Sequence, residues 1–573
     1  MKIATKIHST QLLITALLLL TGLKTLAQST LVPLGNNAYD IIDRMEIKSG
    51  ALSHIIFSDV KPYTRMNADA FAEMMDSSKT ISFSRVDRQN LYYIFSDNGE
   101  WYSRGEIQSK DTILKWFYQT KADLYSHVSN AFTIKVNPVF YFTAGAEPDS
   151  SKIVAQNSRG FNIRGWIDKK IGYYADFLET DALEPGYVQA RINETLAVPG
   201  YGRYIPYHVR GVDYSNSDGY FDFTIAKYIL VQFGQDKNFI GDGYRSMFLS
   251  DFSNNYLFLK LSTQIWKFNY ENLYMQLTPQ YTDGADTLYE KKYASIQHLS
   301  YDLTKFLNVG LFDAVVFDRT DHFDFSYLNP IIFYDPVEYG LGSSVHDNAL
   351  IGFDYKANFL RHFQLYGQFI LDDYNYGASQ SGSGYFGDKY ANQIGLKWID
   401  VCGIHNLDLQ LENNLSRPYT YSHDDAAYTP TGTETPYTIA NYSNYNQPLA
   451  DPLGANFREY IAIIRYQPFN KLFFTAKFIH STFGSDTGSS NWGGNIFLNY
   501  SDHPLVYGNT IGQGVKNTLF IADFTMSYMI KHNFFIDLRY TQRNLNNALY
   551  GQFNTTVLTL TIRMNMAQIQ YDY

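Results

Sequence analysis

The sequence predicts an all-β transmembrane barrel of about 18 antiparallel strands, preceded by a small helical periplasmic region. Three observations predict it: segments of about ten residues in which apolar and polar side chains alternate, 17% aromatic beside 18% charged residues, and short turns that alternate with long polar loops. The alternative is a large soluble β-sandwich, in whose core the charged residues of these segments would be hard to bury.

The N-terminus has the pattern of a secretory signal. Lys2 and Lys6 precede an apolar run over residues 12–20, and Thr25-Leu26-Ala27 offers small residues to a signal peptidase. We expect a signal peptide over residues 1–27, cut after Ala27. Its apolar core is too short for an anchor, and no later stretch supplies about 18 consecutive apolar residues, so the mature chain is expected to have no transmembrane helix.

Residues 28–130 predict a helical periplasmic region that closes the inner mouth of the barrel. Helical spacing is present over residues 39–45 and 67–75, where Asn67 suits the N-cap position, and a third helix is expected to begin near Ser84.

Residues 131–573 predict the outer-membrane barrel, and the alternation is clearest near the end of the chain. Over residues 534–543 the apolar Phe534, Ile536, Leu538 and Tyr540 alternate with Asp537, Arg539, Thr541 and Arg543, and residues 558–565 alternate in the same way with Arg563 on the polar face. One face is therefore predicted to meet lipid and the other a wet interior. The alternation loses its phase after Met566.

The connections predict the strand order. Short turns, expected on the periplasmic side, fall near residues 168–170, 226–227, 267–269, 304–305, 357–358, 402–403, 467–470 and 531–533. Long outward loops are expected at 235–256, 319–348, 374–389, 416–456 and 482–516. The count is 18, which places both termini on the periplasmic side. Pro138 weakens the first strand, and residues 180–218 leave room for one more hairpin.

Composition narrows the function. The formal net charge is −10, or −13 without the three lysines of residues 1–27, so nucleic acid is not expected as a partner. Cys402 is the only cysteine, which excludes disulfides within the chain and cysteine-based metal sites. We expect no cofactor and no metal.

The densest cluster of polar and aromatic residues lies between the fifth and sixth strands, and by the alternation of turns and loops it is expected outside the barrel or folded inward from outside. Its mixture of carboxylates, amide, cations and tyrosine suits polysaccharide, because hydroxyl groups need polar partners and sugar faces stack on rings. The candidate glycan-binding residues are Asp236, Lys237, Asn238, Asp242, Tyr244, Arg245 and Asp251. The alternative is a loop whose charges pair with one another and brace the barrel wall.

Two further loops are weaker candidates. Residues 318–324 hold His322 among carboxylates, which suggests calcium or a surface hydrolase, but the spacing misses the known calcium loop and no serine elbow is present. A solvated cluster of charges is the favoured interpretation. The loop at 416–456 carries Tyr419, Tyr421, Tyr428, Tyr437, Tyr442 and Tyr445, which could face a glycan or pack on neighbouring loops.

Residues 234–251, 327–338 and 347–352 together resemble the capsule-assembly (Wzi-type) outer-membrane barrels. The likeness is to the Bacteroidetes branch, which includes a protein associated with gliding motility, and residues 43–50 are also similar to that branch. The resemblance covers most of the mature chain. It implies an 18-stranded barrel with an N-terminal helical element that binds surface polysaccharide, but it assigns no sugar-contacting residues.

The sequence therefore predicts a barrel that is not an enzyme, in the outer membrane of a Gram-negative bacterium. Its predicted partners are outer-membrane lipid and capsular or exopolysaccharide, whose assembly or attachment at the cell surface it supports. The alternatives are a sugar or solute porin whose lumen is lined by Asp537, Arg539 and Arg563, and a component of surface adhesion or gliding machinery.

Overall fold

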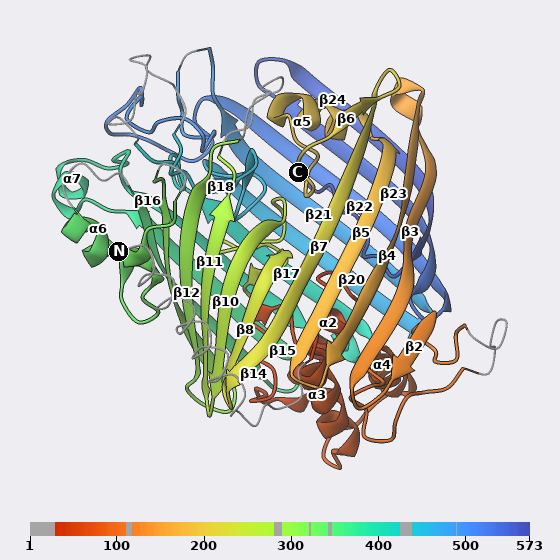
Figure 1. Ribbon diagram of the computed structural model, residues 1–573. Coiled ribbons are helices and arrows are strands. Elements are labelled where there is room, and N and C mark those ends of the chain that lie inside the picture. The colour runs from red at the N-terminus through yellow and green to blue at the C-terminus, as the bar shows by residue number, and fades with distance from the viewer. Residues whose placement is uncertain are drawn as a thin grey trace, which may run out of the picture.

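A computed structural model describes residues 29–109, 117–279, 289–319, 322–341, 347–424, 438–488 and 490–573. Over these residues the chain forms a closed antiparallel barrel of 18 strands, which confirms the predicted fold class (Figure 1). The wall strands are β3 (Phe132–Glu147), β4 (Lys152–Ile167), β5 (Ile171–Leu183), β7 (Gly211–Ala226), β8 (Ile229–Asp236), β10 (Tyr256–Ile265), β11 (Phe268–Leu277), β12 (Lys292–Asp302), β13 (Leu307–Phe317), β14 (Asn348–Phe359), β15 (Phe363–Asp373), β16 (Lys389–Trp398), β17 (Leu407–Ser416), β20 (Phe457–Phe469), β21 (Leu472–Ser485), β22 (Val515–Lys531), β23 (Phe534–Asn547) and β24 (Gly551–Met564).

The barrel closes where β24 pairs with β3. Residues 558–564 of β24 pair with residues 140–146 of β3, while the short strand β2 (Tyr125–Val128) pairs with β3 nearer its start. Pro138 is tolerated within β3, opposite Phe161. The room foreseen for an extra hairpin holds helix α5 (Gly186–Thr195) and the short strand β6 (Ile205–Tyr207), which pairs with β7.

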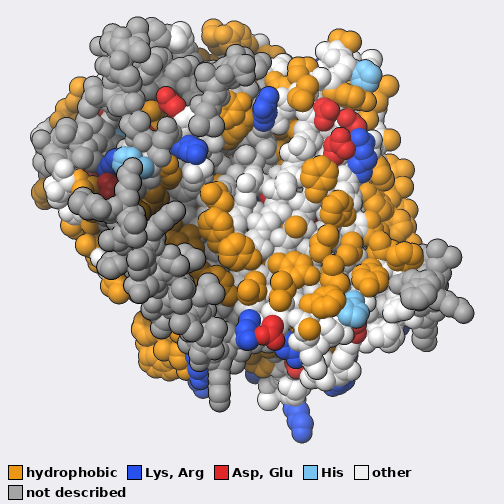
Figure 2. Space-filling view, viewed as in Figure 1, with side chains coloured by type: hydrophobic (Ala, Val, Ile, Leu, Met, Phe, Trp, Pro, Cys, Tyr) orange, Lys and Arg blue, Asp and Glu red, His pale blue; other side chains and the backbone are white. Residues whose placement is uncertain are grey.

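The two faces of the wall differ as predicted. On β24, Leu558 and Leu560 are exposed on the outer face, while Thr561 and Arg563 are buried inside. Apolar side chains lie across the middle of the outer surface, and charged side chains gather toward its two ends (Figure 2). This is the distribution that a surrounding bilayer requires.

The two ends of the barrel carry different connections. Short turns gather at one end, the lower end in Figure 1, and long loops at the other. We call them the short-turn end and the long-loop end. The loops include the 3-10 turn η2 (Phe325–Leu328), helices α6 (Tyr334–Leu341) and α7 (Tyr376–Ser381), and the short strands β18 (Ser443–Asn444) and β19 (Gln447–Pro448).

Three helices fill the short-turn mouth: α2 (Ala38–Ser49), α3 (Arg65–Ser77) and α4 (Arg85–Asp97) (Figure 1). They share an apolar core that includes Met45, Phe71 and Ile94. The N-cap of α3 is Thr64, which accepts a hydrogen bond from the Asn67 N–H, so the prediction of Asn67 as N-cap was wrong by three residues. Ser84 and Asp87 form the capping box that begins α4.

The predicted signal peptide, residues 1–27, lies outside the described residues. None of the helices in the described part of the chain is both long and apolar enough to cross a membrane.

The interior is less wet than predicted. Inward-facing side chains of β10 to β16 include Phe258, Phe312 and Ile370, which form an apolar cluster with Met247 and Phe248 from the connection between β8 and β10. Phe248 stacks on Phe312 with ring centroids 4.3 Å apart. Part of the inner face of β10 to β16 is therefore apolar, while other inward-facing side chains of the same strands, such as His298, Asp354 and Lys356, are polar or charged.

Candidate functional site in the barrel interior

The segment predicted to bind glycan turns into the barrel. Residues 237–255, here called the inward loop, run down the lumen until β9 (Phe239–Ile240) pairs with β1 (Val60–Lys61) of the helical region. The Gly241 N–H then donates to the Asp59 carbonyl at 2.7 Å. Gly241 has a φ of +146°, and a β-carbon there would lie 2.8 Å from the Gln368 side chain, so glycine is required at this turn.

Three of the seven predicted residues make ion pairs or hydrogen bonds deep inside. Asp242 lies 3.2 Å from the Lys356 ammonium. The Arg245 guanidinium pairs with Glu459 at 3.2 Å, and the Tyr244 hydroxyl donates to Asp572. Asp242 and Arg245 are buried and pair with side chains of the wall, not with one another as the alternative interpretation had it, so they brace the inward loop against the wall.

The other four residues lie nearer the long-loop end. Asn238 is buried and accepts a hydrogen bond from Lys260 at 3.0 Å. The Lys237 ammonium donates to the Gly200 carbonyl at 2.7 Å, and the Asp236 carboxylate accepts from the Lys237 N–H. Asp251 is exposed.

A second segment also enters the lumen. Residues 565–573, here called the tail, follow β24 and run back inside the wall. The periplasmic position of both termini stays a prediction. Arg539 donates to the Ile569 carbonyl at 2.8 Å, and Arg543 donates to the Tyr573 carbonyl at 3.0 Å. The Tyr573 ring lies under the Arg191 guanidinium of α5, with 5.1 Å between them.

A cavity of about 1350 Å³ remains between the helices, the inward loop, the tail and the wall. Six of the seven predicted residues line it, all except Asn238. Its walls carry many tyrosines, among them Tyr39, Tyr174, Tyr201 and Tyr220, together with carboxylates and amides. It is lined by residues of both ends, from Lys471 at the short-turn end to Asp251 at the long-loop end.

One acidic wall of the cavity was not among the predicted site residues. Asp176 of β5 lies directly opposite Asp218 of β7, and both face the cavity. Asn255 and Asn216 donate to the two oxygens of Asp218 at 2.5 and 2.6 Å, and Tyr174 donates to Asp176 at 3.0 Å. Among the described residues neither carboxylate forms an ion pair, so this acceptor-rich patch can receive hydroxyl hydrogens from a neutral ligand.

The helical region is fixed to the wall by buried ion pairs. Arg44 of α2 bonds to Asp87 of α4 and to Asp400 and Asp408 of the wall, and Lys48 reaches Asp87 at 2.6 Å and Asp400 at 2.9 Å. Burial alone would raise the pKa of Asp400, which lies in the turn η3 (Val401–Gly403) as its N-cap, but the Arg44 guanidinium lowers that pKa to about 2.

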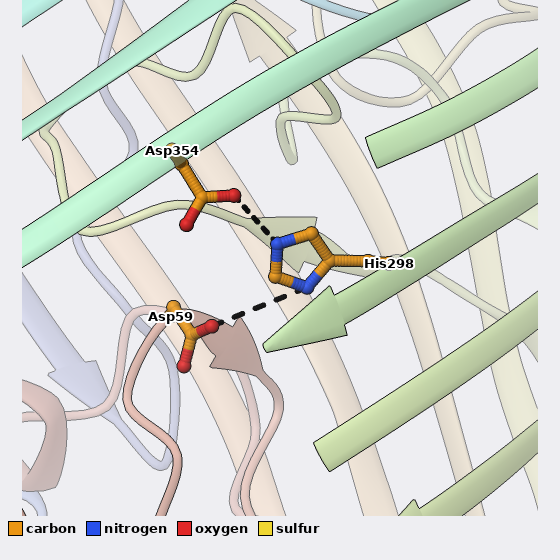
Figure 3. A group of neighbouring side chains, drawn as sticks. All are labelled: Asp59, His298 and Asp354. Carbon is orange, nitrogen blue, oxygen red and sulfur yellow. Dashed lines mark hydrogen bonds and ion pairs between the residues drawn. The ribbon is translucent and has the colours of Figure 1, made fainter. Parts of the chain in front are cut away.

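One buried group joins the helical region to the wall and has metal-ligand chemistry. Figure 3 shows His298 of β12 between Asp354 of β14 and Asp59, which precedes β1. His298 Nε2 lies 2.6 Å from Asp354 and Nδ1 lies 4.0 Å from Asp59. Neither Asp59 oxygen has a hydrogen-bond partner among the described residues. The ligand atoms lie within 4.8 Å of one another, so the group could hold a metal ion, although the sequence predicted none.

The other two candidate loops are braced from within. Arg319 pairs with Asp347 at 2.7 Å and with Asp324 at 3.1 Å, so charges near His322 hold their own loop; Thr320 and Asp321 lie outside the described residues. Of the tyrosines in the 416–456 loop, Tyr419, Tyr421, Tyr442 and Tyr445 are buried, and Tyr428 and Tyr437 lie outside the described residues. Tyr421 and Tyr442 donate to the Met247 and Phe248 carbonyls at 2.8 Å, so they cap the inward loop.

No protein-family model and no curated protein sequence matches the chain. Among solved structures it matches Wzi, an outer membrane protein involved in group 1 capsule assembly in Escherichia coli and a carbohydrate-binding β-barrel, with a TM-score of 0.54 and 12% identity over 94% of this chain and all of that one. This chain shares the fold of Wzi. OccAB4 of Acinetobacter baumannii (TM-score 0.41, 12% identity, 76% of this chain and 97% of that one) and OprD of Pseudomonas aeruginosa (0.39, 12%, 75% and 95%) also match.

The likeness to Wzi agrees with the predicted resemblance at the level of fold. The Bacteroidetes branch and the link to gliding stay predictions.

Proposed function

We propose that this protein is an outer-membrane barrel that binds capsular or exopolysaccharide and supports its assembly or attachment at the cell surface, without enzymatic activity. The observation that carries the proposal is the cavity between β5, β7 and the inward loop, where acceptor groups and tyrosine rings face the same space. Sugar hydroxyls need acceptors such as Asp176 and Asp218, and sugar faces pack on rings such as Tyr201. The shared fold with the carbohydrate-binding barrel Wzi supports the same assignment.

Within this proposal the predicted site moves inward. Asp242 and Arg245 hold the inward loop in place, and Lys237 and Asp251 lie where a chain entering from the long-loop end would first meet the cavity. Each contact is weak, but a polymer that presents many repeats gains avidity from repeated capture.

The test is retention of the native capsule or exopolysaccharide by the purified barrel on a glycan-binding assay. Asp176→Asn with Asp218→Asn replaces both carboxyl groups by amides, each with one acceptor oxygen fewer, and a typical hydrogen bond contributes about 0.5–1.5 kcal/mol, so the loss of two should lower retention about tenfold. The matched control is Asp181→Asn on the same strand, whose carboxylate pairs with Arg159 outside the barrel at 3.0 Å.

Unchanged retention in the double variant, with heat-modifiable migration showing a folded barrel, would contradict the cavity site. Loss of retention in Asp181→Asn as well would show a general defect. A role in surface adhesion or gliding stays an alternative, and comparing capsule retention with cell spreading in a deletion strain distinguishes the two.

A further inference from the structure

One segment of the chain lies outside the barrel, against the face that should meet lipid. Residues 322–341, here called the outer strap, connect β13 to β14 and contain η2 and α6. In Figure 1, α6 lies at the left beside the wall, below the top of the loops. The strap packs on outward-facing side chains of β11, β12 and β13.

The wall under the outer strap breaks the apolar pattern of the outer face. Asn272 of β11, Gln297 of β12 and Asp313 of β13 are directly opposite one another in register and form a polar row across three strands. The row lies at the middle of these strands, between Leu261 on β10 and Ile351 on β14. The middle of the strands is the level at which lipid chains surround a barrel of this kind.

The outer strap covers this row. Asp313 is 7% exposed, whereas Leu311, its neighbour on the same face of the same strand, is 50% exposed. Above the row, Tyr293, Val315 and Phe317 of the wall are buried against Tyr327 and Tyr334 of the strap.

The polar side chains of the wall satisfy the backbone of the outer strap. The Tyr334 N–H donates to Asp313 at 2.9 Å, and Gln297 donates to the Asn329 carbonyl at 3.1 Å. Tyr274 donates to the Leu328 carbonyl at 3.0 Å, and Tyr270 donates to the Pro330 carbonyl. Irregular backbone is tolerated at membrane depth only where protein supplies its hydrogen bonds, and this wall supplies them.

The free face of the outer strap is mainly apolar. Its large exposed apolar side chains are Phe325, Leu328, Ile331, Ile332, Phe333, Tyr339 and Leu341, with Ile331 at 83%, and His322, Ser326, Asn329 and Asp335 are exposed beside them. On its flank the apolar surface of the wall continues with Leu311, Ile351 and Phe353, which are all exposed. So large an apolar patch on one connecting segment requires a partner.

We propose that the outer strap is immersed in the outer leaflet of the membrane, where its exposed apolar side chains contact lipid acyl chains and its backbone is held by the polar row of the wall. The polar row and the strap act together. The polar side chains of the row and the backbone of the strap would each cost free energy in lipid if they lacked hydrogen-bond partners, and by bonding to each other they leave mainly apolar side chains facing the acyl chains.

The test places an environment-sensitive label on single cysteines in a Cys402→Ser background, with the full barrel reconstituted in phosphatidylcholine vesicles. Ile331→Cys reports the strap, Leu560→Cys on the outer face of β24 reports lipid, and Val209→Cys, fully exposed in the turn between β6 and β7, reports water. Doxyl-labelled lipids should quench residue 331 as strongly as residue 560, and aqueous iodide should quench it several-fold less than residue 209.

Quenching of residue 331 that follows residue 209 would overturn the proposal, because the strap would then lie in water. Protection from both quenchers would also overturn it, because a second copy or another protein would then cover the strap. In the Ile331→Cys background, Asp313→Ala should raise iodide quenching several-fold while Leu311→Ala does not. Equal quenching in these two variants would refute the role of the polar row.

Discussion

The charged side chains in the lumen mainly hold distant segments of the chain together. Asp242, Arg245 and Arg44 each join segments that are far apart in sequence, and each is buried where an unpaired charge would be costly. The sequence shows that these residues are charged and can form several hydrogen bonds. It does not show which residues they pair with, because every partner lies more than 40 residues away.

Asp69 of α3 is a buried carboxyl of a different kind. Burial, with Glu73 and Glu100 nearby, raises its pKa to about 8, and its Oδ1 has no hydrogen-bond partner among the described residues. Between about pH 4 and 8 the unfolded chain releases this proton while the folded chain keeps it, so the group lowers the free energy of unfolding as pH rises, by at most about 1.4 kcal/mol per pH unit.

We therefore expect Asp69→Asn to stabilise the helical region, more at pH 8 than at pH 5. Urea unfolding followed by fluorescence at both pH values measures the difference. Asp76→Asn, near the C-terminal end of the same helix and partly exposed, is the control and should shift the midpoint equally at both values. A difference between wild type and Asp69→Asn that does not grow with pH would contradict this assignment.

The ring of His298 lies between two buried carboxylates, those of Asp59 and Asp354. His298→Ala leaves Asp59 and Asp354 without it, and loss of one partner from a buried charged group costs about 3–5 kcal/mol. His54→Ala, which removes a half-exposed histidine paired with Asp302 at 2.9 Å, should cost about 1 kcal/mol or less. Equal destabilisation would argue against a special role for His298, and metal analysis of the intact protein shows whether an ion shares its site.

Among the elements, the strands were the most predictable. Their signal is local: a period of two in apolar residues, interrupted by turns, fixes both the strand and its outward face. On β10 to β16 some inward-facing side chains are also apolar, as at Phe312 and Ile370, and nothing local shows that a loop will pack there.

The inward loop shows where prediction from sequence stopped. Its residues were singled out for their chemistry, yet its course depends on pairing residues 60–61 with residues 239–240, and no local pattern predicts contacts between residues 178 and 180 positions apart. Asp176 and Asp218 could have been predicted to face the interior, because the alternation that predicts the barrel also assigns even positions of β5 and β7 to the interior. The spacing of Asp59, His298 and Asp354 in the sequence gave no indication that these three residues would lie together.

The anchor of the inward loop is Phe248, which is fully buried against Phe312. Phe248→Ala removes a ring from a packed cluster and should lower the free energy of unfolding by about 3–5 kcal/mol. Val209→Ala in the exposed turn after β6 should change it by less than about 0.5 kcal/mol. Temperature-dependent migration of the folded barrel on gels provides the comparison, and similar midpoints for the two variants would show that the loop is not anchored there.

In the whole molecule, the helices, the inward loop and the tail occupy much of the lumen. The wall supplies the ion pairs and hydrogen bonds that hold them there. We expect the intact protein in planar bilayers to show a conductance far below that of an open 18-stranded pore, because three segments obstruct the path. A steady, ion-selective open pore would instead favour the solute porin that the sequence left as an alternative.

The tail has a consequence for biogenesis. The seam of the cylinder is only seven residue pairs between β24 and β3, and the nine residues after β24 lie on the enclosed side of it. The tail cannot pass through a closed barrel wall. Either it enters the lumen before β24 pairs with β3, or one end of the closed barrel stays open long enough to admit it.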